Sequence, residues 1–250
     1  MTAPISIYRH SLATRLMHWL NALCLFLVLM SGLQIFNADP QLYWGSYGAN
    51  TDPAAFAIGG FPHWATLPGE RDLATGRRIH FFFAWLLVVN STAFFAVSFA
   101  SGHVRRDLLP SRAEIAPKHV LHDIGEHLRL RFPRGEAARH YNVLQKLAYL
   151  GVLFILGPLI LATGLTMSPA MDAAFPWLLN LFGGRQSART LHFIAAALVV
   201  LFIIVHLAMV LLAGPVRELR SMITGRYVLP PADTTAVDAA AVDAATGRAD

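Results

Sequence analysis

The sequence predicts an all-α integral membrane protein, built as a bundle of four membrane-spanning helices. Hydrophobic residues account for 55% of the 250 residues and charged residues for only 14%, which is unlike the composition of soluble globular domains. Four apolar runs are long enough to cross the hydrocarbon core of a bilayer, which is about 30 Å thick. They cover residues 16–36, 79–100, 147–167 and 191–213.

We expect residues 1–230 to form one four-span domain that contains all of these runs. The last segment, 231–250, is rich in Ala, Asp and Thr. Such a segment cannot bury enough apolar surface to fold, so we expect a disordered tail. The first run follows Arg9 and Arg15 but is longer than the apolar core of a secretory signal peptide. We therefore interpret it as a span that the protein retains.

The distribution of basic residues predicts the orientation of the spans. The N-terminal segment, the loop 101–146 and the C-terminal segment together carry fifteen of the twenty lysines and arginines. Loops rich in Lys and Arg remain in the cytoplasm, so both termini and this middle loop are expected there. The chain would then be a multi-pass membrane protein with both termini in the cytoplasm. The net charge of +5 reflects this topology, and without a folded basic domain we expect no nucleic-acid partner.

Four histidines lie in the apolar runs, and their positions are informative. His192 and His206 are fourteen residues apart in the last run, which places both imidazoles on nearly the same helix face, about 21 Å apart along the axis. His18 lies near the cytoplasmic end of the first run, and His80 lies near the opposite end of the second. Because successive spans alternate in direction, His80 is level with His192, and His18 is level with His206.

Two level pairs of intramembrane histidines suggest two bis-histidine haem sites. An ionisable side chain inside a membrane is costly and is therefore a functional candidate; for any one histidine, the alternative is a hydrogen bond to a neighbouring helix. Two axial imidazoles leave the iron no open position, which suits electron transfer. We predict two b-type haems between the helices, with these four histidines as iron ligands. Arg15, Arg77 and Arg78 could pair with haem propionates or, equally, with lipid headgroups.

The motif Arg15-Leu-Met-His18-Trp19 and the pair His192 and His206 resemble the ligand motifs of bacterial di-haem cytochrome b subunits of the cytochrome b-561 superfamily. The resemblance covers about residues 8–226. This group includes the membrane subunits of nickel-iron hydrogenase, respiratory formate dehydrogenase and thiosulfate-reductase-type enzymes, and Leu42-Tyr43-Trp44-Gly45 is similar to the outer loop of the last type. The resemblance implies a cytochrome b domain that passes electrons between a periplasmic oxidoreductase, of molybdopterin or hydrogenase type, and the quinone pool of a respiratory chain.

A second motif of the resemblance is Tyr141-Asn142-Val143-Leu144-Gln145-Lys146, at the cytoplasmic start of the third run. A similar stretch lines the menaquinone pocket of the formate dehydrogenase membrane subunit, beside the inner haem. The resemblance implies that Asn142 and Gln145 hydrogen-bond ubiquinone or menaquinone, since an amide can donate to an oxygen that gains negative charge. From the residues alone, capping of the helix or contact with headgroups is the alternative.

Two other functions remain open. One is a stand-alone superoxide:quinone oxidoreductase of the cytochrome b-561 type, which needs an exposed cationic site near the outer haem. The other is a haem-free transporter or structural membrane protein, which an absorption spectrum would distinguish. The first outer loop, 37–78, is rich in aromatic residues, which could form a docking surface for a partner or an interfacial belt. The docking interpretation favours a subunit of a larger oxidoreductase.

Overall fold

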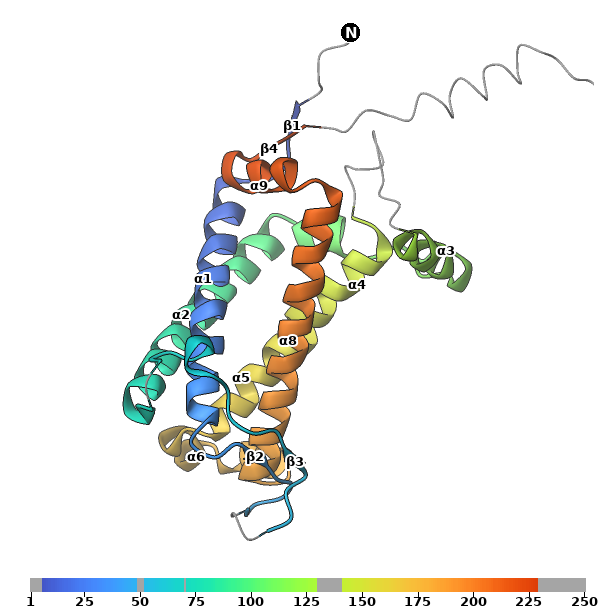
Figure 1. The fold of residues 1–250 in the computed structure, drawn as a ribbon. Coiled ribbons are helices and arrows are strands. Elements are labelled where there is room, and N and C mark those ends of the chain that lie inside the picture. Colours follow the sequence, from blue (N-terminus) through green and yellow to red (C-terminus); the bar gives the residue numbers. More distant parts are fainter. Residues whose placement is uncertain (1–5, 49–51, 70, 130–140, 229–250) are drawn as a thin grey trace, which may run out of the picture. The chain divides into compact units, whose positions relative to one another are not determined.

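The computed structural model describes residues 6–48, 52–69, 71–129 and 141–228. Its long helices are α1 (Leu12–Phe36), α2 (Leu73–Ala100) and α8 (Arg185–Ala213), and a fourth helical segment consists of α4 (Val143–Gly151), η4 (Val152–Leu156) and α5 (Gly157–Thr166). By length and composition all four could cross a membrane, and Figure 1 shows each as a long helical segment. This confirms the predicted fold class, with four long apolar helices. Each begins several residues before its predicted start. The predicted tail, 231–250, lies outside the described residues.

The chain divides into two compact units. The first unit contains Met1–Arg15, Val104–Leu147 and Leu207–Asp250, and the second contains Leu16–His103 and Ala148–His206. The second unit therefore holds the main part of all four spans and the loops that join them at one end. All four intramembrane histidines belong to this second unit.

In the second unit the helices turn polar side chains inward and large apolar side chains outward. Phe82 and Ile204 are more than half exposed, whereas Asn90 is buried. The Asn90 amide, on α2, donates to the Met17 carbonyl (2.9 Å) and to Oδ1 of Asn21 (2.7 Å), both on α1. In a membrane the apolar outer faces contact lipid, and buried hydrogen bonds of this kind hold the helices together.

The third span departs from a regular α-helix because it contains Pro158. A proline has no N–H, and its ring clashes with the carbonyl four residues earlier. The chain accommodates this with the π-helical segment η4, after which the Gly157 N–H bonds to the Val152 carbonyl, five residues before it. η4 also packs against α2, since the rings of Phe154 and Phe95 lie 5.4 Å apart between centroids. Hydropathy alone does not predict this interruption.

Two connections complete the second unit. In the loop after α1, strands β2 (Gln41–Leu42) and β3 (Phe56–Ala57) pair antiparallel, and the 3₁₀ turn η1 (His63–Ala65) follows. Between α5 and α8 lie the short helices α6 (Pro169–Ala174) and α7 (Pro176–Leu181). Each of the two begins with a proline, at a position where the missing N–H costs no helical hydrogen bond.

The loop after α1 is bonded to the N-terminal part of α8. Arg189 forms an ion pair with Asp39 (2.9 Å) and also donates to the Gln41 carbonyl (2.8 Å). The Thr190 hydroxyl donates to the Tyr43 carbonyl (2.6 Å). These bonds attach the loop to the same part of α8 that carries His192.

Gly45 caps the N-terminus of α8. Its carbonyl accepts hydrogen bonds from the N–H groups of Gln186 (3.0 Å) and Ser187 (3.1 Å), which have no partner within the helix. In return, the Gly45 N–H donates to Oγ of Ser187 (2.7 Å). The close approach requires Gly184, where a Cβ atom would lie 2.6 Å from the Gly45 carbonyl oxygen.

The first unit joins both ends of the chain to the middle loop. Strand β1 (Ser6–Tyr8) pairs antiparallel with β4 (Arg226–Val228), which follows α9 (Pro215–Thr224), and the middle loop contains η2 (Val104–Leu108) and α3 (Pro117–Leu128). The guanidinium of Arg9 lies over the rings of Tyr141 (5.6 Å) and Tyr227 (4.7 Å). This cation–π pair links the two terminal segments to the start of the third span.

The contact between Gly184 and Gly45 predicts a difference between two neighbouring glycines. Gly183 and Gly184 both have positive φ (73° and 108°), so alanine costs on the order of 1 kcal/mol at either position. Only at Gly184 would the new Cβ also meet backbone; at Gly183 the nearest atom is 3.8 Å away. We expect Gly184→Ala to lower the unfolding temperature in detergent clearly more than Gly183→Ala does. Equal effects would contradict this account of the cap.

Candidate functional site

The four intramembrane histidines lie in two facing pairs. The ring centroids of His80 (α2) and His192 (α8) are 6.4 Å apart, and the ring planes are inclined by 63°. The centroids of His18 (α1) and His206 (α8) are also 6.4 Å apart, with an inclination of 53°. The two pairs therefore share one spacing. Because both include a residue of α8, they lie at two levels of that helix, about 21 Å apart.

Backbone carbonyls of neighbouring helices orient both rings of the first pair. Nδ1 of His80 lies 3.0 Å from the Val28 carbonyl oxygen of α1, and Nδ1 of His192 lies 3.0 Å from the Ile160 carbonyl oxygen of α5. A carbonyl oxygen only accepts, so Nδ1 of each ring carries the proton and donates it. Nε2 of each ring then has a free lone pair that can bind a metal.

The second pair lies among aromatic side chains. Trp19 meets the His18 ring edge-on at 5.4 Å between centroids, and Phe202 stacks on the His206 ring at 5.9 Å, with 17° between the planes. Nδ1 of His18 is buried and has no hydrogen-bond partner among the described residues. Such burial costs free energy, so within the described ranges this histidine is held without the backbone partner that orients each ring of the first pair.

Both pairs fit a metal with two axial imidazoles. Metal–nitrogen bonds of about 2 Å on opposite sides of one ion would separate the ring centroids by roughly 6 Å, and both observed separations are 6.4 Å. In the described part of the chain, no group of three or more His, Cys, Asp or Glu side chains could hold a metal ion. Each pair thus supplies only two ligands. A haem fits this donor set, since its macrocycle supplies the remaining ligands.

The three arginines singled out in the sequence have other contacts. Arg15 donates to the Ile223 carbonyl within the first unit. In the second unit, the Arg77 guanidinium lies 6.0 Å from the ring centroid of Phe81. Arg77 and Arg78 are both exposed in the first turns of α2. Their pairing with haem propionates stays a prediction.

Asn142 and Gln145 cap the N-terminus of α4. The Gln145 N–H donates to Oδ1 of Asn142 (2.8 Å), and the Asn142 N–H donates to Oε1 of Gln145 (3.3 Å). This reciprocal pattern is a capping box, the alternative that the residues alone had suggested. Both bonds use the amide oxygens, so they leave open whether the amide nitrogens contact a quinone, which stays a prediction.

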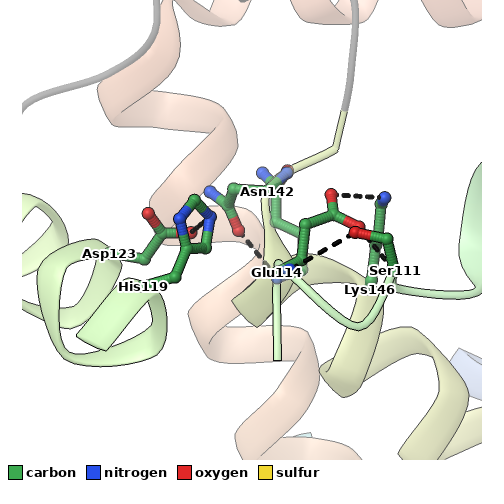
Figure 2. Close-up of polar contacts among 7 residues, drawn as sticks. Ser111, Glu114, His119, Asp123, Asn142 and Lys146 are labelled. Carbon is green, nitrogen blue, oxygen red and sulfur yellow. Dashed lines mark hydrogen bonds and ion pairs between the residues drawn. The ribbon is translucent and has the colours of Figure 1, made fainter. Parts of the chain in front are cut away.

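An ion pair lies next to this capping box (Figure 2). Lys146 is buried, with only 8% of the residue exposed, and its Nζ lies 2.8 Å from Oε1 of Glu114 in the middle loop. The Ser111 N–H donates to Oε2 of Glu114 (2.6 Å). The hydrogen bonds from Lys146 and Ser111 lower the pKa of Glu114 to about 2. Glu114 is therefore ionised at physiological pH, and its contact with Lys146 fixes the middle loop to the start of the third span.

Two hydroxyl groups beside the first histidine pair were not predicted from the sequence. Oγ of Ser31 lies 3.3 Å from Nδ1 of His80, and Oγ1 of Thr163 lies 3.1 Å from Nδ1 of His192. The signal that could have identified them is a similarity between two short segments of different spans, VLMSG at 28–32 and ILATG at 160–164.

Comparison with known proteins gives a family match and bacterial relatives. A family model described as prokaryotic cytochrome b561 matches residues 9–225. A putative protein-methionine-sulfoxide reductase subunit, YedZ1, of Azospira oryzae is 29% identical over 211 residues, covering 84% of this chain and 93% of that protein. A putative cytochrome of Escherichia coli, YdhU, is 28% identical over 229 residues, covering 88% of this chain and 74% of that protein. With four apolar spans and a family match over most of its length, the chain belongs to the prokaryotic cytochrome b561 family.

Proposed function

We propose that this chain is a di-haem b-type cytochrome subunit that carries electrons between the quinone pool and an oxidoreductase on the periplasmic side of a bacterial inner membrane. The observation that carries the proposal is the presence of two facing histidine pairs with one common spacing, 6.4 Å, at two levels of one helix. When bound, a haem held by two imidazoles supplies a one-electron carrier without an open coordination position.

Each histidine pair has its own part in this function. His80 and His192 would hold the haem on the periplasmic side, where the loop after α1 is bonded to α8. His18 and His206 would hold the haem nearer the cytoplasm. The separation of about 21 Å along α8 is most of the roughly 30 Å thickness of the hydrocarbon core. The two sites together therefore reach from one side of the membrane to the other, which one site could not do.

An exposed aromatic surface supports a protein partner. Trp44, Tyr47 and Trp64 are 52%, 90% and 83% exposed, and all three lie in the loop after α1. Aromatic residues are enriched in protein interfaces. The relative in A. oryzae is named as a putative reductase subunit, so we propose that the partner is a periplasmic oxidoreductase that receives electrons from quinol through this chain.

A second candidate function is the stand-alone superoxide:quinone oxidoreductase. The observation in its favour is the exposure of Arg77 and Arg78 shortly before His80, because two cationic side chains would attract a small anion to this side of the bundle. Fast reduction of the purified chain by superoxide, without any partner, would favour this candidate over the subunit.

The first prediction of the proposed function is a haem-to-protein ratio near two. Pyridine haemochrome analysis of purified full-length protein measures it. His192→Ala should remove the haem of the His80 pair, and His206→Ala the haem of the His18 pair, so each variant should retain one haem. His63→Ala, at an exposed position of η1, should retain both. A ratio near zero or one in fully loaded wild-type protein would reject the two-haem arrangement.

The second prediction concerns orientation, which rests on the distribution of basic residues. Single cysteines at Tyr47 and Arg112, two exposed positions, are introduced in a Cys24→Ala background. A membrane-impermeant thiol reagent should modify position 47 in intact spheroplasts and position 112 only after the membrane is opened. Labelling of position 112 alone in intact spheroplasts would invert the proposed topology.

The third prediction separates quinone binding from helix capping at Asn142. Asn142→Ala removes both the cap and the amide donor, whereas Asn142→Ser keeps a capping oxygen but loses the amide N–H groups, and its shorter hydroxyl does not reach the position of the amide nitrogen. Both variants should retain two haems and slow the reoxidation of dithionite-reduced protein by a quinone analogue in stopped flow. The expected loss, about 1–3 kcal/mol for a hydrogen bond to developing negative charge, corresponds to roughly a 5- to 150-fold slower rate. A wild-type reoxidation rate in Asn142→Ser would mean that Asn142 caps the helix and does not bind the quinone.

A further inference from the structure

Two five-residue segments make the same contacts with the two histidines of the first pair. Residues 28–32 (VLMSG) of α1 contact His80, and residues 160–164 (ILATG) of α5 contact His192. In each segment the carbonyl of the first residue lies 3.0 Å from Nδ1 of the histidine. The hydroxyl oxygen of the fourth residue lies 3.3 Å from Nδ1 in one segment and 3.1 Å in the other.

Each hydroxyl is oriented by its own helix. Oγ of Ser31 lies 2.6 Å from the Leu27 carbonyl oxygen, and Oγ1 of Thr163 lies 2.6 Å from the Leu159 carbonyl oxygen. The hydroxyl proton therefore points to the carbonyl four residues earlier. The oxygen is left as an acceptor toward the imidazole, so the Nδ1–H of each histidine is shared between a carbonyl and a hydroxyl.

The last residue of each segment leaves room for the ring. A Cβ atom on Gly32 would lie 3.3 Å from Cε1 of His80, and a Cβ atom on Gly164 would lie 3.3 Å from Cε1 of His192. Both distances are too short for the ring to keep its place beside a larger residue. The hydroxyl residues Ser31 and Thr163 are completely buried, so water does not compete for these hydrogen bonds.

We propose that the two segments are matched positioning elements, which lock His80 and His192 as Nδ1–H donors and thereby hold the reduction potential of their site low. This inference rests on the function proposed above. Donation of the Nδ1 proton to an acceptor raises the electron density on Nε2, and a more electron-rich ligand stabilises ferric iron over ferrous iron. The other site is built differently, since Nδ1 of His18 is buried without a hydrogen-bond partner in the described part of the chain.

Optical redox titration of the purified full chain tests the proposal, after the haem-to-protein ratio has been measured. Thr163→Val removes one hydroxyl while keeping the side-chain shape, and Ser31→Ala removes the other. Each should raise the lower of the two midpoint potentials and leave the higher one unchanged, and the double variant should raise the lower one further. Thr163→Ser should restore the wild-type value. Gly164→Ala should change the electron paramagnetic resonance g-values of the same haem, because the new Cβ atom would displace the His192 ring.

A matched control lies on α2. The Thr92 hydroxyl also bonds back to the carbonyl four residues earlier (Val88, 2.8 Å), but Thr92 is exposed, so Thr92→Val should leave both potentials unchanged. With two haems bound, unchanged potentials in both Thr163→Val and Ser31→Ala would overturn the positioning role and leave the proposed function standing. Haem loss in Thr163→Ser as well as Thr163→Val would overturn it too, since packing would then be the cause. A haem-to-protein ratio below two in the wild-type protein would instead overturn the proposed function, and this inference with it.

Discussion

The burial of imidazoles among apolar helices is the constraint on which the rest of this structure depends. A polar group left unpaired in hydrocarbon costs several kcal/mol, and water is not present to help. At His80 and His192 the carbonyls of Val28 and Ile160 offset this cost, each with a lone pair that the helix does not need. Each of these bonds joins two spans, α1 to α2 and α5 to α8. The groups that solvate the rings therefore also hold the bundle together.

The same constraint accounts for the polar interior of the second unit. Asn90 ties α2 to α1 through two hydrogen bonds, and Thr163 and Thr190 are completely buried. In water-soluble proteins the core is apolar and the surface polar. Here the surface of the spans is apolar because lipid covers it, and specificity between helices comes from a few buried polar contacts.

Hydropathy was sufficient to predict all four spans, because an apolar run as long as the bilayer is thick is rare outside membrane-spanning helices. The histidine positions along the spans also followed from counting residues. The rotation of each helix about its own axis could not be obtained by counting residues. The contacts of Ser31 and Thr163 with the histidines were therefore not predicted. At Asn142 and Gln145 the sequence allowed both capping and quinone contact, since one amide side chain is suited to both. The structure shows the cap, whereas a quinone contact depends on a separate molecule, whose position does not follow from the sequence.

The π-helical segment η4 has a consequence for the faces that the third span presents to its neighbours. A π-turn takes in one residue more than an α-turn, so the helix before Val152 and the helix after Gly157 are out of phase by about 100°, one residue of helical rotation. A hydrophobic stripe on one face of the helix before η4 would therefore continue on a different face of the helix after η4. Deletion of one residue in this segment would bring the two halves back into phase and turn Thr163 and Gly164 away from α8. The extra residue thus acts as a rotational spacer that sets which face of α5 contacts His192.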